Sequence, residues 1–296
     1  MGNEKVTKTV QFFLSSPRGN VVLLVMVALI IFFLNLNGWD LWNPDEPRYA
    51  QVAQEIRSSG EWILPHLNGE IYAEKPPLFF WLIALFSFFT GEVNEISARL
   101  PSAFSALGCI LLTLFLGKRL FNQKAGFFAA LVLLTSVEFF WLGRRANIDM
   151  TLSFWVTLAI TFFLLGLREG KKSRFFYLIP YVAMGIGVLT KGPVGFLLPF
   201  LTMVVYLVVT KNFRHFKRLE IPWGLLIFIL IIGAWLIPAC IKGGEEYTRT
   251  ILFKQNVGRF TEAWSHAQPF YYYLEVFPSG FIPWVVLLPG ALLWGL

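Results

Sequence analysis

The chain has 296 residues and a mean hydropathy of +0.62, and only 15% of its residues are Asp, Glu, Lys or Arg. Soluble domains carry about 25% charged residues, so this composition excludes an ordinary soluble protein and indicates a protein of the lipid bilayer. The net charge of +7 fits basic loops that set membrane orientation. We therefore expect membrane lipids, and no nucleic acid, as partners.

Apolar stretches recur along the chain, and each approximates the ~17–25 residues that a spanning helix needs. The predicted spans cover residues 20–36, 100–117, 125–142, 150–167, 175–189, 193–210, 222–240 and 281–296. The first span lacks a small-residue cleavage site before Asn35, which favours a retained anchor over a removed signal peptide. The last span reaches residue 296 without a polar tail, so we expect the N-terminal part of a longer protein.

The apolar segment Pro77–Thr90 is too short for a typical span, and its length favours a helix lying at the membrane interface. If this segment does not cross, four basic clusters fall on one side of the membrane, as the positive-inside rule requires. These clusters are Lys5, Lys8 and Arg18; Lys118, Arg119 and Lys124; Arg168, Lys171, Lys172 and Arg174; and Lys211, Arg214, Lys217 and Arg218. We therefore expect one all-α, polytopic transmembrane bundle over residues 1–296, with long outer loops at 37–99 and 241–280.

The first outer loop carries acids and cations beside each other. Asp45 and Glu46 are adjacent and Arg48 follows them, while the pair Glu74–Lys75 precedes the interfacial segment. From Pro47 onward apolar residues recur at helical spacing, so a role for Asp45 as a plain helix cap is an equal alternative. For Glu74–Lys75 the alternative is a weak, solvated surface pair.

The next two outer turns hold further candidates. Arg144 and Arg145 depart from the positive-inside pattern, which indicates anion binding; snorkelling of two interfacial arginines is the alternative. Asp149 opens the following predicted helix, where a plain cap is again the alternative. Lys191 lies in a tight outer turn, where it can serve simply as a cation at a helix C-terminus.

The last outer loop adds Arg259, and His266 ahead of a run of tyrosines, although a lone histidine is more often structural than catalytic. Taken together, the outer side chains place many cations at membrane depth, and this suits the phosphate of a lipid. A nearby carboxylate can take the proton of an attacking hydroxyl. The cations are Arg48, Lys75, Arg144, Arg145, Lys191 and Arg259.

Four segments, 43–50, 74–78, 146–149 and 266–273, occur in an order that resembles GT-C glycosyltransferases using polyprenyl-phosphate-linked sugars. The nearest resemblance is to the lipid A 4-amino-4-deoxy-L-arabinose transferases, relatives of the protein O-mannosyltransferases. It covers nearly all of the sequence and implies a GT-C-type bundle with juxtamembrane helices in the first outer loop. Chains of this family are longer, with further spans and an outer soluble domain.

The resemblance also implies roles for individual residues. Asp45 corresponds to the catalytic acid and Asp149 to a second acidic position near the site. Glu74 matches a position associated with a divalent metal ion, and His266 matches a site histidine. The positions around the donor phosphate correspond to Arg48, Tyr72, Lys75 and Arg259, and further candidates are Glu46, Arg144, Arg145 and Lys191.

The implied reaction moves a sugar, with inversion, from a polyprenyl-phosphate donor to an acceptor on the periplasmic side of a bacterial inner membrane. Aminoarabinose and lipid A are the favoured sugar and acceptor, and protein or glycan O-mannosylation is the alternative within the family. A lipid-phosphate transporter or flippase would use the same cations. It should also carry polar residues deep in its spans, whereas these spans are almost purely apolar.

Overall fold

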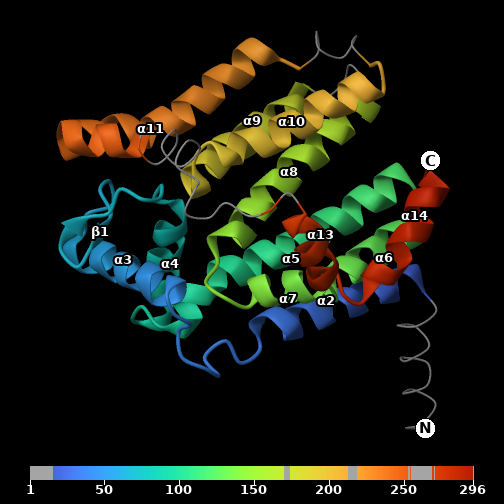
Figure 1. Cartoon of the computed structure of the whole chain (residues 1–296), viewed down its shortest axis with the longest axis horizontal. Helices are drawn as coiled ribbons and strands as arrows, with labels where there is room; N and C mark the ends of the chain where they lie inside the picture. Colours follow the sequence, from blue (N-terminus) through green and yellow to red (C-terminus); the bar gives the residue numbers. More distant parts are fainter. Residues whose placement is uncertain are drawn as a thin grey trace.

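The computed structural model describes residues 16–169, 174–212, 219–252, 254, 269 and 271–295. This part of the chain is helical apart from one antiparallel hairpin of β1 (His66–Leu67) and β2 (Glu70–Ile71), which confirms the all-α prediction (Figure 1). The helices are α2 (Pro17–Phe33), α3 (Asp45–Ser59), α4 (Leu78–Thr90), α5 (Glu95–Leu120), α6 (Gln123–Leu134), α7 (Val137–Gly143), α8 (Ile148–Glu169), α9 (Arg174–Lys191), α10 (Val194–Val209), α11 (Ile221–Arg249), α13 (Tyr272–Gly280) and α14 (Leu288–Gly295), with a 3-10 turn at Trp284–Leu287.

Within the described residues, three helices are long and apolar enough to cross a membrane, namely α5, α8 and α11. The bent pairs α6–α7 and α13–α14 raise this number to five if each pair counts as one span. Helices α2, α4 and α10 are apolar but shorter. Each of the eight predicted stretches thus contains helix, but length and hydropathy support a full crossing for fewer of them than predicted.

The predicted span 125–142 is broken into α6 and α7, whose axes differ by 69°. The break lies at Thr135 and Ser136, whose hydroxyls donate back to the carbonyls of Leu131 and Val132, each at 2.7 Å. Such back-bonding competes with the helical ladder and bends helices. The first amide of α7, that of Val137, donates instead to the carbonyl of Ile282 at 3.1 Å, so α7 joins the segment that follows α13.

Helix α5 lies at the centre of one half of the bundle and packs against α2, α4, α6 and α8 (Figure 1). Its approach to α6 is close because Gly126 faces it: a Cβ on Gly126 would stand 2.5 Å from the carbonyl oxygen of Leu114. Small residues of this kind let membrane helices approach backbone to backbone. The other half is a layer of α8, α9, α10 and α11, and α8 joins the two halves.

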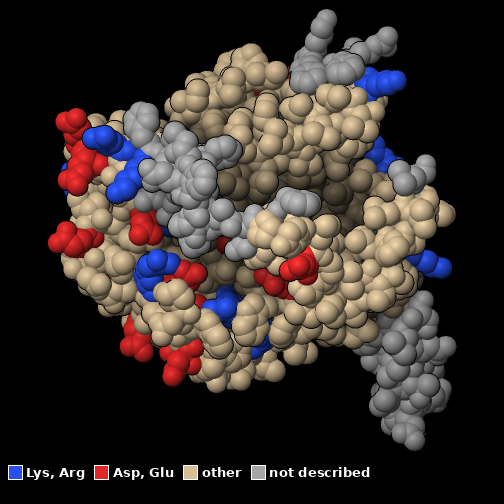
Figure 2. All heavy atoms as spheres, in the orientation of Figure 1, with Lys and Arg blue, Asp and Glu red and all other residues tan. Residues whose placement is uncertain are grey.

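The first outer loop, with α3, α4 and the hairpin, forms one end of the molecule (Figure 1). In Figure 2 acidic side chains gather over this end together with several Lys and Arg, whereas the charged side chains visible at the opposite end are Lys and Arg. Basic side chains without acids at one end agree with the positive-inside rule for a multi-pass protein. Helix α4 packs against α3 and α5, so the segment Pro77–Thr90 forms part of this end of the bundle.

Candidate active site

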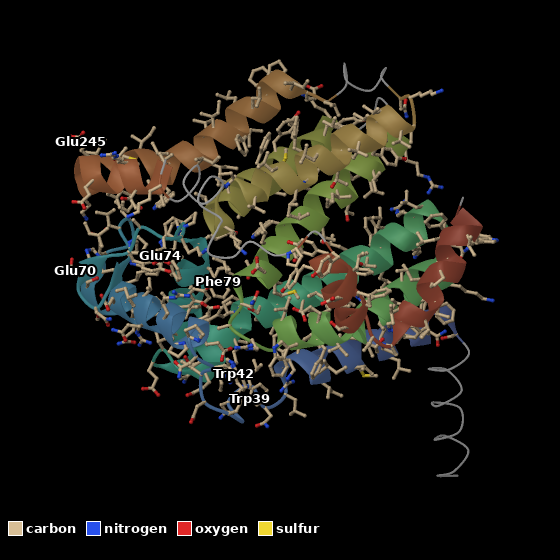
Figure 3. All side chains as sticks on the ribbon, in the orientation of Figure 1. Trp39, Trp42, Glu70, Glu74, Phe79 and Glu245 are labelled. Carbon is tan, nitrogen blue, oxygen red and sulfur yellow. The ribbon has the colours of Figure 1, made fainter. Side chains whose placement is uncertain are left out.

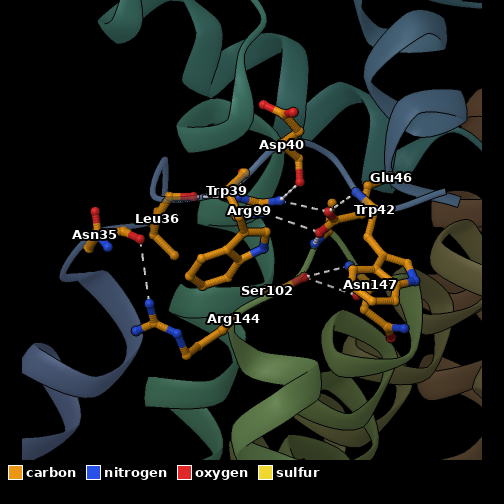
Figure 4. Close-up of polar contacts among 11 residues, drawn as sticks. Asn35, Leu36, Trp39, Asp40, Trp42, Glu46, Arg99, Ser102, Arg144 and Asn147 are labelled. Atoms are coloured by element: carbon orange, nitrogen blue, oxygen red, sulfur yellow. Dashed lines mark hydrogen bonds and ion pairs between the residues drawn. The ribbon is translucent and has the colours of Figure 1, made fainter.

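The first outer loop is held by a buried ion pair between Glu46 of α3 and Arg99 of α5, both fully shielded from solvent. Arg99 Nη2 lies 2.8 Å from Glu46 Oε2, and Arg99 Nε lies 3.2 Å from Glu46 Oε1. The same guanidinium donates to the carbonyls of Leu36, Trp39 and Asp40 (Figure 4). The pair therefore fixes the path of the chain from the end of α2 to the start of α3.

Glu46 also joins the loop between α7 and α8 to this arrangement. Its carboxylate accepts hydrogen bonds from the amides of Trp42, at 2.7 Å, and Ala146 (Figure 4). Burial alone would raise the pKa of Glu46, but the hydrogen bonds from Arg99 and these two amides hold that pKa below its ordinary value. Glu46, predicted as a site candidate, is therefore an ionised anchor that positions its neighbour Asp45.

Asp45 is the first residue of α3, and the alternative role as a helix cap does not describe its contacts. The N-cap position is Pro44, which makes no side-chain capping bond. The carboxylate of Asp45, which is half exposed, pairs with Arg48 one helical turn later. Asp45 and Arg48 therefore present an acid and a cation together at the outer surface.

Two tyrosines lie beside this pair, and α4 holds them in place. The rings of Tyr49 and Tyr72 pack edge-on against Phe79 and Phe80, with centroids 5.5 and 5.7 Å apart. Burial and the charge of Asp45 raise the pKa of Tyr49 to about 12. Burial and the carboxylate of Glu74 likewise raise the pKa of Tyr72 above its ordinary value. Both phenols are thus neutral hydrogen-bond donors at physiological pH.

Glu74, Lys75 and Lys191 line a cavity of about 220 Å³ between the first outer loop and helices α9 and α11. In Figure 3 Glu74 lies nearer the middle of the molecule than Glu70 of the hairpin. Tyr72 Oη donates to Glu74 Oε2 at 3.4 Å, so the hydroxyl of Tyr72 contacts a carboxylate that lines the cavity. The rest of the lining is mainly apolar and includes Val188, Pro193, Ile232, Trp235, Leu236 and Leu252.

Asp149 reaches the same cavity through Lys191. Helix α8 is capped by Asn147, whose Oδ1 accepts from the amides of Asp149 and Met150 at 2.8 and 3.1 Å. The carboxylate of Asp149 therefore does not act as the cap, and it pairs with Lys191 at the end of α9. The structure thus brings the predicted residues Glu74, Lys75, Lys191 and Asp149 together.

The two outer arginines differ in their contacts. Arg144 donates to the carbonyls of Ile31 and Leu34 at the end of α2, where a cation stabilises the negative end of the helix dipole. In the described residues Arg144 thus contacts the end of α2, and anion binding by Arg144 stays a prediction. Arg145 lies over the rings of Trp42 and Trp141, at 5.1 and 5.3 Å from their centroids.

Two predicted residues, Arg259 and His266, lie outside the described residues. For a divalent metal ion, Glu74 is the predicted ligand, but no three His, Cys, Asp or Glu side chains in the described ranges lie close enough together to hold one. Glu74 is instead the carboxylate of a cavity whose other charged groups are lysines. The donor set among the described residues does not fit a metal centre, and a metal ion at Glu74 stays a prediction.

Arg99 is the functional residue that sequence reasoning missed. It stands just before the predicted span 100–117, where an ionisable group beside an apolar run is a signal of a buried partner. Its acidic partner, Glu46, lies 53 residues earlier in the chain.

Residues 74–237 match the family described as dolichyl-phosphate-mannose-protein mannosyltransferase. The chain is also 32% identical, over 277 residues, to an undecaprenyl phosphate-alpha-4-amino-4-deoxy-L-arabinose arabinosyl transferase of Pectobacterium atrosepticum. That alignment covers 92% of this chain and 49% of the relative. The chain thus spans about half the length of the relatives that it matches.

Solved structures show the same similarity. The crystal structure of ArnT from Cupriavidus metallidurans bound to undecaprenyl phosphate matches with a TM-score of 0.83 and 29% identity, over 92% of this chain and 50% of that one. The oligosaccharyltransferase of Archaeoglobus fulgidus matches at a TM-score of 0.55 and 16% identity, over 96% of this chain and 38% of that one, and shows a shared fold alone. These matches confirm the predicted GT-C-type membrane fold.

Proposed function

The chain belongs to the dolichyl-phosphate-mannose-protein mannosyltransferase family. We propose that it transfers a sugar from a polyprenyl-phosphate donor to an acceptor at the outer face of its membrane. Within this activity we favour 4-amino-4-deoxy-L-arabinose as the sugar and lipid A as the acceptor, because the relatives bear that sugar in their names. The acceptor, the periplasmic side and the bacterial inner membrane are parts of the same proposal.

The observation that carries the proposal is the cavity that joins two lysines to an apolar wall. A polyprenyl phosphate needs cations for its head and apolar contacts for its first isoprene units. Lys75 and Lys191 supply the first, and the side chains of α9 and α11 that line the cavity supply the second. The similar structure of ArnT holds undecaprenyl phosphate, a ligand of this chemistry.

The reaction follows from charge balance. An acceptor oxygen attacks the anomeric carbon of the sugar while the bond from that carbon to the phosphate oxygen breaks, so one displacement inverts the configuration. Asp45 accepts the proton of the acceptor hydroxyl, and the phosphate leaves with the bonding electrons. Arg48, Lys75 and the hydroxyl of Tyr72 stabilise the leaving phosphate, and one such donor is worth roughly 3–4 kcal/mol in the transition state.

Transfer can be measured with the chain reconstituted in liposomes, undecaprenyl-phosphate aminoarabinose as donor and lipid A as acceptor. We expect mass spectrometry to show lipid A heavier by one aminoarabinose residue, and free undecaprenyl phosphate in equal amount. Undecaprenyl-phosphate mannose with a peptide acceptor tests the alternative within the family. Flipping of the lipid with no transfer to any acceptor would replace the proposal by the transporter hypothesis.

A further inference from the structure

A second cluster of functional groups lies at the outer rim, and its residues differ from those that line the lysine cavity. Trp39, Trp42 and Trp141, each more than one third exposed, line a shallow cavity together with Asp40, Leu41 and Asn43. Figure 3 shows Trp39 and Trp42 next to each other at the edge of the molecule. The reaction proposed above uses none of these residues.

Arg145 is held against this cluster by aromatic faces alone. Its guanidinium lies over the rings of Trp42 and Trp141, and within the described ranges it makes no hydrogen bond or ion pair. The neighbouring Arg144 differs, because its donors bind carbonyls at the end of α2. A guanidinium offers five N–H donors, so Arg145 is a positioned cation whose donors are available to a ligand.

A role as a plain interfacial belt explains the exposed tryptophans but not the cation between them. Indole faces stack on sugar rings, and an arginine with available donors binds phosphate oxygens in pairs. The carboxylate of Asp40 in the same cavity offers acceptors for sugar hydroxyls. The charge and the ring faces together fit a phosphorylated sugar.

The cluster also stands at a fixed place relative to the candidate catalytic acid. Trp42 lies three residues before Asp45 in the first outer loop. Glu46, which follows Asp45, accepts a hydrogen bond from the amide of Ala146, and Ala146 follows Arg145. Both loops are therefore fixed to each other within one residue of Asp45 and of Arg145.

We propose that Trp42, Trp141 and Arg145 form a docking site for the phosphorylated sugar headgroup of a lipid acceptor. This inference rests on the proposed function and names the chemistry that selects the acceptor: stacking selects the sugar, and Arg145 selects its phosphate. The donor lipid binds elsewhere, in the lysine cavity.

The test measures binding of two lipid A preparations, the bis-phosphorylated form and a dephosphorylated form, to the chain in nanodiscs without any donor. We expect Arg145→Gln and Trp42→Ala each to weaken binding of the phosphorylated form at least tenfold and to leave undecaprenyl phosphate binding unchanged. Arg145→Lys keeps the charge without the paired donors and should bind with intermediate affinity, which separates a binding defect from a folding defect.

The matched controls are Arg174→Gln and Trp223→Ala, which remove a similar arginine over an exposed indole, 5.5 Å from its centroid, at the other end of the molecule. Both should bind lipid A as the wild type does. Equal binding of the two lipid A forms, or wild-type affinity in Arg145→Gln, would overturn the docking site. Because no donor is present, either result leaves the transfer proposal standing, and failure of transfer leaves the binding result standing.

Discussion

Replacement of Glu46 by Gln is expected to destabilise the protein strongly while hardly changing its shape. Glu46 and Arg99 are fully buried, and the guanidinium of Arg99 makes five hydrogen bonds, two of them to Glu46. Glu46→Gln leaves a buried cation without its counter-charge, which costs about 3–5 kcal/mol. The pair holds the first outer loop in place, so the free energy of unfolding should fall. The contacts at the protein surface should stay unchanged.

The assay is thermal unfolding in detergent. Unfolding is monitored by the reaction of a maleimide dye with the thiol of Cys109, which is buried in the folded protein. At roughly 2–4 °C per kcal/mol we expect the midpoint to fall by at least about 6 °C. The control is Lys242→Ala, which breaks the exposed pair of Lys242 with Glu61 and should change stability by less than about 1 kcal/mol. An unfolding midpoint for Glu46→Gln within about 2 °C of the wild-type midpoint would refute the anchor role of Glu46.

The same pair predicts a pH dependence. The pKa of Glu46 lies below its ordinary value of 4.5 in the folded protein, so folding favours the ionised form. The stabilisation is fully present above pH 4.5 and is lost as the pH falls through the lowered pKa. The wild type should therefore lose more stability than Glu46→Gln as the pH falls below 4.5, and parallel stability curves for the two proteins would contradict this.

Three further predictions concern the site. Asp45→Asn should lower transfer at least about a hundredfold with unchanged affinity for undecaprenyl phosphate, and near-normal turnover would remove Asp45 from catalysis. Asp149→Asn removes the carboxylate that positions Lys191 beside the cavity, so transfer should fall, while stability changes by less than about 1 kcal/mol because the pair is partly exposed. EDTA should leave transfer intact, since no group of three His, Cys, Asp or Glu side chains among the described residues could hold a metal ion; inhibition reversed by Mg²⁺ would make Glu74 a metal ligand.

The apolar stretches of the sequence predicted the helices well, because the position and length of such a stretch can be read directly from the local sequence. The break between α6 and α7 was not predicted, since it depends on Thr135 and Ser136 bonding back to their own helix and on the amide of Val137 finding Ile282 far along the chain. The hairpin at His66–Ile71 is too short to leave an alternating pattern.

For the site, the residue types indicated which side chains carry the chemistry, but the sequence did not show which of these side chains contact each other. Asp45, Glu74 and Lys75 were predicted from their chemistry. The structure places Glu74 and Lys75 at one cavity and pairs Asp45 with Arg48. The distinct contacts of Glu46, Arg144 and Arg145 could not be predicted, because each depends on a partner on another element. Capping of α8 by Asn147 likewise left Asp149 available to Lys191, which a cap prediction from Asp149 alone could not reveal.

The central claim is that the cations of the lysine cavity bind a polyprenyl phosphate, and the most direct measurement is the affinity for undecaprenyl phosphate. Lys75→Ala is compared with Lys242→Ala, a lysine of the same outer end that pairs with Glu61 instead of lining the cavity. A hydrogen bond to a charged group is worth about 1.5–3 kcal/mol, so Lys75→Ala should bind at least tenfold more weakly while Lys242→Ala binds normally. Equal affinity in the two variants would contradict the account.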